Sequence, residues 1–140
     1  MREKQLGFTL IELIAVITLL GVLSVVLFSR ISSIGASRVQ ASRDDVIAAL
    51  FFAQQLAMSR SNIQVIISSG SIDVTQNGAS IKLDSNFYPL AMPAGISLSA
   101  SSSNISFDKL GRTASNTIQI QSSDGSFTAN VNVETTGYAH

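Results

Sequence analysis

The stretch GFTLIELIAVITLLGVLSVVLF, from Gly7 to Phe28, decides how this chain is organised. Between Phe8 and Phe28 it has 21 residues and a single ionisable side chain, that of Glu12. As a helix these residues extend about 32 Å, which matches the roughly 30 Å hydrocarbon core of a bilayer. The sequence therefore predicts a membrane-spanning helix over residues 8–28.

Glu12 lies inside this apolar run, where an ionised carboxylate is costly and usually marks a functional position. No Lys, Arg or His occurs between Leu6 and Val16, so the surrounding helix offers no positive side chain. An α-amino group would lie close to Glu12 if the chain were cut just before Phe8. In a bundle of staggered helices, the amine of one subunit would then meet the carboxylate of the next. We therefore interpret Glu12 as an assembly residue.

The string Gly7-Phe8-Thr9-Leu10-Ile11-Glu12 follows a short charged leader and precedes the apolar run. This arrangement resembles the class III signal of type IV pilins and pseudopilins. The resemblance implies that residues 1–7 are a prepilin leader, that a prepilin peptidase cuts between Gly7 and Phe8, and that the new N-terminal Phe8 is methylated. It also gives Glu12 the role of the acidic residue that recruits subunits into a helical fibre.

An uncleaved signal anchor is the alternative for the same stretch, with Glu12 near one end of the span. A secretory signal peptide fits less well, because its apolar run has about 7 to 15 residues and ends at an A-x-A site that is missing here. Charge counting leaves the orientation open, since basic residues flank both ends of the span. The resemblance implies a single pass through the inner membrane with a cytoplasmic leader, followed by transfer to a pilus or pseudopilus in the periplasm or at the cell surface.

Composition limits the remaining function classes. The 140 residues allow one membrane segment and one small domain, and the nine basic and nine acidic side chains cancel. From Ser61 onward three basic residues stand against five acidic ones, so no nucleic-acid partner is expected. With no cysteine, neither a disulfide nor a thiolate metal site can form.

The sequence beyond the span predicts an amphipathic helix over residues 29–60. Its predicted apolar face repeats at three- and four-residue steps, and Ile47, Phe51 and Leu56 widen it. Gly21 and residues 29–35 are weak helix formers where the helix is able to bend. The members of the face are Val39, Val46, Leu50, Ala53 and Ala57.

Residues 61–140 predict a β-rich domain, because the hydrophobic period changes to two after Arg60. The turn pairs Ser69-Gly70 and Asn77-Gly78 divide residues 63–83 into a meander of three strands. Residues 84–95 carry both prolines and predict a loop, whose apolar side chains either plug the edge of the core or form an exposed contact patch. Those side chains are Phe87, Tyr88, Leu90 and Met92. Further strands are predicted at residues 96–99, 105–107, 117–121 and 127–134.

The predicted fold class is α+β and pilin-like: a long N-terminal helix packed on an antiparallel sheet of about six or seven strands. The segment Phe107-Asp108-Lys109-Leu110-Gly111-Arg112 resembles the F-D-x-x-G-R element of GspH/FimT-like minor pilins and pseudopilins, including mannose-sensitive haemagglutinin (MSHA) minor pilins. The ending Gly137-Tyr138-Ala139-His140 also resembles the MSHA type. Asp108 and Arg112 are expected to pair across the glycine turn.

No catalytic, cofactor-binding or metal-binding residue is predicted, and the chain is not expected to be an enzyme. The single histidine is His140, and no D-x-D-x-D-G calcium motif occurs. The resemblance implies a structural minor pilin of an MSHA-like type IV pilus that helps to initiate, cap or anchor fibre assembly. A minor pseudopilin of a type II secretion system, or a tip pilin for adhesion or DNA uptake, is the alternative. The implied partners are other pilin subunits, the prepilin peptidase, an inner-membrane assembly platform and the membrane.

Overall fold

The computed structural model describes the backbone of residues 8–82 and 88–140, and the side chains of these residues except 26–33. The predicted leader, including Gly7, and the loop residue Phe87 lie outside the described residues. The chain divides into two compact units, one ending at Ile34 and one running from Gly35 to His140.

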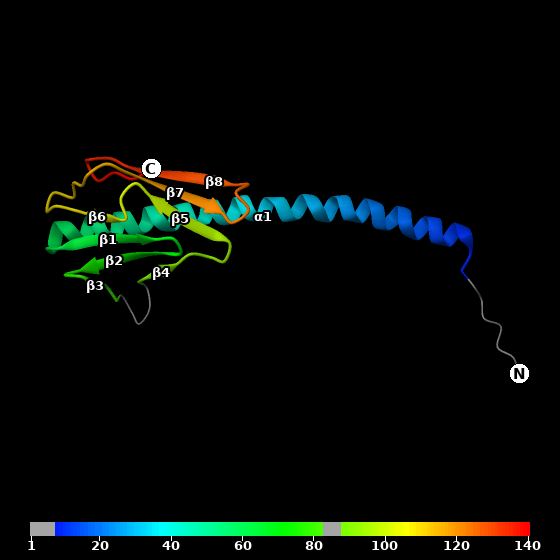
Figure 1. Cartoon of the computed structure of the whole chain (residues 1–140), viewed down its shortest axis with the longest axis horizontal. Helices are drawn as coiled ribbons and strands as arrows, with labels where there is room; N and C mark the ends of the chain where they lie inside the picture. The colour runs from blue at the N-terminus through cyan, green and yellow to red at the C-terminus, as the bar shows by residue number, and fades with distance from the viewer. Residues whose placement is uncertain (1–7, 83–87) are drawn as a thin grey trace, which may run out of the picture. The chain divides into compact units, whose positions relative to one another are not determined.

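A single helix, α1, runs from Leu10 to Ser59 (Figure 1). It contains no proline and is helical throughout residues 29–35, where the sequence suggested that a bend was possible. Within the described residues, no helical stretch is both long and apolar enough to cross a bilayer. The side chains of residues 26–28, at the end of the predicted span, are not described. The membrane span over residues 8–28 therefore stays a prediction.

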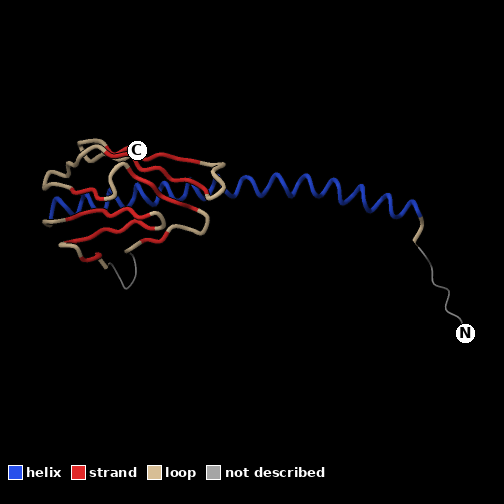
Figure 2. The backbone as a smooth tube through the Cα atoms, viewed as in Figure 1, coloured by secondary structure: helices blue, strands red, loops and turns tan. Residues whose placement is uncertain are grey.

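Eight antiparallel strands of the described chain form two sheets in the second unit (Figure 2). The larger sheet has the order β3-β2-β1-β6, and β4 also pairs with β2. The smaller sheet has the order β5-β7-β8. The larger sheet contains β1 (Ile63–Ser68), β2 (Ser71–Gln76), β3 (Ala79–Ser80), β4 (Leu90–Ala91) and β6 (Asn104–Ser106). The smaller sheet contains β5 (Ile96–Ala100), β7 (Asn116–Ser122) and β8 (Thr128–Val133).

The predicted meander is confirmed, because β1, β2 and β3 are consecutive antiparallel neighbours, but the prediction was wrong in two other respects. The strands belong to two sheets, and the third meander strand has only two residues, β3. The residues predicted to be a loop contain β4, which pairs with Ser71 and Ile72 while β3 pairs with Thr75 and Gln76. Both short strands therefore share one edge of β2. Alternating apolar and polar residues show which face of a strand is buried. The length of the strand, however, depends on how much of the neighbouring strand's edge is free to pair with it.

The core lies between the C-terminal half of α1 and the inward faces of both sheets. The predicted helical face is confirmed, since each of its members is at most 3% exposed. Ile72, Ile118 and Ile120 from the two sheets are fully buried against this cluster, and each such side chain contributes roughly 1.5–3 kcal/mol by leaving water. Phe51 departs from the prediction and remains 37% exposed.

The loop aromatic Tyr88 plugs the core, which was one of the two predicted alternatives. Its side chain is 5% exposed, and its ring stacks on Phe52 with centroids 5.7 Å apart. Leu90 and Met92 also pack against the core. Burial raises the pKa of the Tyr88 hydroxyl, and the Asp73 carboxylate raises it further.

The outward face of the smaller sheet is polar and carries no charge. Its side chains are exposed or half-buried and all carry hydroxyl or amide groups. The sheet therefore has one solvent-exposed face and one face packed against the core. Its members are Ser97, Ser99, Thr117, Gln119, Gln121, Thr128, Asn130 and Asn132.

Candidate assembly surfaces

The predicted cleavage site lies next to the start of α1. Phe8 is 87% exposed and precedes the helix. Thr9 caps the helix, because its Oγ1 accepts a hydrogen bond from the backbone N–H of Glu12 at 3.3 Å. Its carbonyl accepts from the N–H groups of Glu12 and Leu13 at 3.1 and 3.2 Å. Thr9 and Glu12 thus have the spacing of a capping box, in which an N-terminal Thr and a Glu three residues later cap the same helix end.

This position gives Glu12 a local role that the sequence prediction missed. A carboxylate in the first helical turn lies near the positive end of the helix dipole, which is worth about 0.3–1 kcal/mol at an exposed site. The T-x-x-E spacing of Thr9 and Glu12 in the sequence would have revealed this position in the first turn. The ion pairs of the described residues are Arg43–Asp44 and Arg112–Asp108, so Glu12 gains no full positive charge within that part of the chain.

Between Leu10 and Val25, α1 presents a continuous apolar surface apart from Glu12. Every large aliphatic side chain in this range is exposed, from 43% at Ile14 to 76% at Leu10. The hydroxyls do not interrupt the surface, because Thr18 donates to the carbonyls of Ile14 and Ala15 and Ser24 donates to that of Leu20. Polar groups satisfied within their own helix need no outside partner, which suits an apolar environment.

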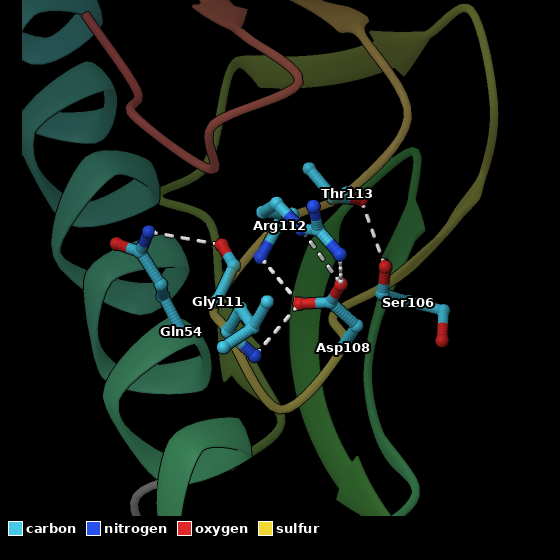
Figure 3. Close-up of polar contacts among 7 residues, drawn as sticks. Gln54, Ser106, Asp108, Gly111, Arg112 and Thr113 are labelled. Carbon is cyan, nitrogen blue, oxygen red and sulfur yellow. Dashed lines mark hydrogen bonds and ion pairs between the residues drawn. The ribbon is translucent and has the colours of Figure 1, made fainter.

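The F-D-x-x-G-R segment closes on itself through Asp108 (Figure 3). Its Oδ1 accepts from the N–H groups of Leu110 and Arg112, both at 2.8 Å. Its Oδ2 lies 3.0 Å from both Nε and Nη2 of Arg112, which gives the expected ion pair. Gly111 supplies the positive φ of +74° that this turn requires. The backbone N–H of Arg112 has the largest effect in lowering the pKa of Asp108, aided by the N–H of Leu110 and the guanidinium.

We expect Asp108→Asn to lose stability in a pH-dependent way. Because folding lowers the pKa of Asp108, its contribution is present above the unfolded-state pKa of about 3.9 and disappears as the pH falls through the lower folded-state value. The difference in unfolding free energy between wild type and variant, measured by denaturant titration, should therefore shrink below about pH 4. A difference that stays constant from neutral to acidic pH would contradict this account.

Gln54 of α1 holds this loop and the C-terminal segment at the same place. Its Nε2 donates to the carbonyl of Gly111 at 3.0 Å and to that of Thr136 at 3.3 Å. Gly137 has a φ of +83°, and a Cβ there would collide with the Gly111 carbonyl and the Gln54 amide. A Cβ on Gly111 would meet Cε of Met58 at 2.5 Å. We call Gln54, Gly111, Thr136 and Gly137 the Gln54 clasp.

The clasp was not predicted from the sequence, although both glycines belong to the segments that carry the family resemblance. It explains why those segments contain glycine at these positions: the backbone must pass close to α1 with a positive φ. Within the described residues, no group of three or more His, Asp or Glu side chains has the arrangement of a metal site.

Comparison with known proteins agrees with the N-terminal signal and the fold. Residues 2–28 match the family described as the prokaryotic N-terminal methylation motif. No curated protein sequence matches the chain significantly. One similar solved structure is the type IV minor pilin FimU of Pseudomonas aeruginosa, at 14% identity, covering 72% of this chain and 90% of FimU with a TM-score of 0.51.

A second is the minor pseudopilin EpsH from the Type 2 Secretion System of Vibrio cholerae, at 12% identity. It covers 74% of this chain and 94% of EpsH, with a TM-score of 0.58. Identities this low establish the fold alone. The predicted α+β, pilin-like fold is therefore confirmed, and so is the methylation motif over the residues that suggested it.

Proposed function

We propose that this chain is a structural subunit of a type IV pilus or of a type II secretion pseudopilus, of the GspH/FimT-like minor class. The observation that carries the proposal is the combination of a methylation motif over residues 2–28 with the fold of a minor pilin and a minor pseudopilin. The exposed apolar surface of α1 between Leu10 and Val25 supports it, because such a surface needs lipid or other helices around it.

The proposed processing step uses the leader and the exposed residue Phe8. A prepilin peptidase would hydrolyse the bond between Gly7 and Phe8, and a methyl group would then be added to the new amine. Phe8 lies four residues before Glu12, so the cut places a positive charge at the end of the helix that carries the carboxylate. The subunit would wait in the inner membrane, anchored by residues 8–28, until an assembly platform moves it into the fibre.

Glu12 provides the proposed assembly contact. Among the described residues it meets the partial charge of the helix end and forms no ion pair, which leaves it short of a full counter-ion. Entry into a fibre would bring the methylated amine of a neighbouring subunit to this carboxylate. The apolar helix would at the same time exchange lipid for other helices. Two interactions would therefore favour assembly: the ion pair between Glu12 and the neighbouring amine, and the packing of the apolar helix against other helices.

An MSHA-like pilus is the first choice, because both the F-D-x-x-G-R segment and the C-terminal ending resemble that type. A secretion pseudopilus uses the same parts, and the similarity to EpsH supports it equally well at the level of the fold. An adhesive tip remains a further alternative. A DNA-uptake tip has less support, since acidic residues outnumber basic ones after Ser61.

The test is to determine the N-terminus by mass spectrometry after expression with and without an active prepilin peptidase. We expect a chain that begins with methylated Phe8 when the peptidase is present and an intact Met1 when it is absent. A second pilin known to be cleaved in the same cells serves as the control for peptidase activity. An intact Met1 alongside a cleaved control would contradict the proposal and favour a plain signal anchor.

A further inference from the structure

Five large apolar side chains are exposed in the described part of the second unit. One is Ile66 on β1, at 36%, and the other four lie around the Gln54 clasp. Phe51 is 37% exposed, Met58 and Tyr138 are each 53% exposed, and Leu110 is 67% exposed. They come from α1, from the F-D-x-x-G-R loop and from the C-terminal segment. Proteins seldom gather such side chains on one surface without a partner. We call these four residues the clasp patch.

The members of the clasp patch come from segments that meet around Gln54. The rings of Phe51 and Tyr138 meet edge to face with centroids 6.3 Å apart, and Tyr138 stacks on His140 at 5.5 Å. On the other side, Met58 lies against Gly111, the neighbour of Leu110. Gln54 lies between the two halves and bonds to both backbone segments, as the close-up shows for Gly111 (Figure 3).

The patch is also held in place before any partner arrives. Two hydrogen bonds from Gln54 fix the backbone of both non-helical segments, and Asp108 fixes the turn that presents Leu110. A preformed surface loses little conformational freedom on binding, which favours affinity. Both Gln54 amide hydrogens are already used within the chain, so they need no acceptor from a partner.

We propose that the clasp patch is the acceptor surface for the apolar N-terminal helix of a neighbouring pilin-like subunit. This inference rests on the proposed function. The occupant follows from the chain itself, whose residues 10–25 form an apolar helix with no described partner. From Leu13 to Val25 that helix has no ionisable side chain, which matches a patch whose four members carry no charge.

The spacing within the patch suits a helix. Phe51 and Met58 are seven residues apart, so they lie two turns and about 10.5 Å apart on one face of α1. Side chains at this spacing form a ridge against which another helix packs, and the Tyr138 ring contacts Phe51 on that ridge. The patch and the apolar helix are different surfaces of one chain. Their pairing is therefore head-to-tail and produces an open-ended array rather than a closed dimer.

The experiment is site-specific photocrosslinking of the full chain in cells that assemble fibres. The photoreactive residue p-benzoylphenylalanine replaces Leu110, which is the most exposed member of the patch, and crosslinked peptides are identified by mass spectrometry. We expect adducts with the first helical residues of a processed pilin-type subunit. The matched control carries the same probe at Gln119, an exposed position on the outward face of β7, and should give no such adduct.

Each result of this experiment decides the inference. Adducts only with lipid, or with the β-rich part of a neighbour, would overturn the acceptor role, and so would equal adducts from Leu110 and Gln119. The amount of wild-type chain in purified fibres is measured in the same cells. A chain present in fibres that gives no helix adduct refutes the acceptor surface alone, whereas a chain absent from fibres refutes the proposed function.

A single substitution provides an independent readout. Leu110→Gln removes an apolar side chain that is mostly in solvent, so the melting temperature should not change. Incorporation into fibres should fall about tenfold, as expected for an anchor residue of an interface. Gln119→Ala is the control and should incorporate normally. Normal incorporation of Leu110→Gln would count against the clasp patch as an interface.

Discussion

Replacing Glu12 with alanine is expected to leave cleavage and membrane insertion intact and to lower incorporation into fibres by at least about tenfold. The substitution removes the carboxylate that would pair with the amine of a neighbouring Phe8. Losing one partner of a desolvated charge pair typically costs about 2–5 kcal/mol, and about 1.4 kcal/mol corresponds to a factor of ten. The measurement compares the amount of variant in sheared, purified fibres with the amount in the membrane fraction.

The position of Glu12 in the first turn of α1, at the spacing of a capping box, requires two controls. Thr9→Ala removes the side-chain oxygen that accepts from the Glu12 N–H but keeps the carboxylate. Glu12→Gln retains a side chain that suits a capping box but removes the charge. If charge pairing drives assembly, Thr9→Ala should assemble almost normally and Glu12→Gln should resemble Glu12→Ala. Normal assembly of Glu12→Gln would refute the charge-pairing account and leave capping as the reason for the residue.

Replacing Gly137 with alanine should destabilise the second unit by about 3 kcal/mol. Forcing a side chain into the left-handed region costs about 1–2 kcal/mol, and overpacking a tight contact costs about 1–3 kcal/mol. Both costs apply here, because φ is +83° and the new Cβ would collide with the Gly111 carbonyl and the Gln54 amide. The free energy of unfolding is to be measured by denaturant titration of the full chain in detergent, followed by circular dichroism.

Gly78 provides the matched control for this prediction. It has a similar φ of +80°, but a Cβ there would meet no atom within 4 Å. Gly78→Ala should therefore cost only the backbone term of about 1–2 kcal/mol. Equal losses for the two variants would show that the close approach at the Gln54 clasp contributes nothing.

Local patterns correctly predicted the elements whose buried face is visible in their own hydrophobic period. The face of α1 that contains Val46 and Leu50 was predicted correctly, because a packed helix shows its buried side directly in its period. Strands β7 and β8 were also recognised as a hairpin, since their inward residues alternate and a short turn joins them. The predicted Asp108–Arg112 pair followed from spacing across a glycine.

Predictions were less successful where the packing of the whole chain, and not the local pattern, decides strand pairing or exposure. The alternation at Ile81 suggested a longer third strand than β3, and the two prolines concealed β4. Neither sequence pattern indicates that two short strands, β3 and β4, pair with the same edge of β2. Phe51 looked like a member of the buried stripe, yet it remains partly exposed beside Tyr138, 87 residues later in the chain.

The sequence alone determined the parts of this protein whose chemistry is contained in consecutive residues. The apolar run with Glu12, the predicted cleavage signal at Gly7 and Phe8, and the change of hydrophobic period after Arg60 are all of this kind. The tertiary structure alone decided the division into two sheets, the Gln54 clasp and the exposed clasp patch. The clasp and the clasp patch depend on segments more than 50 residues apart, and the sheets depend on which strand edges are available as partners. Only the packed chain brings such segments and edges together.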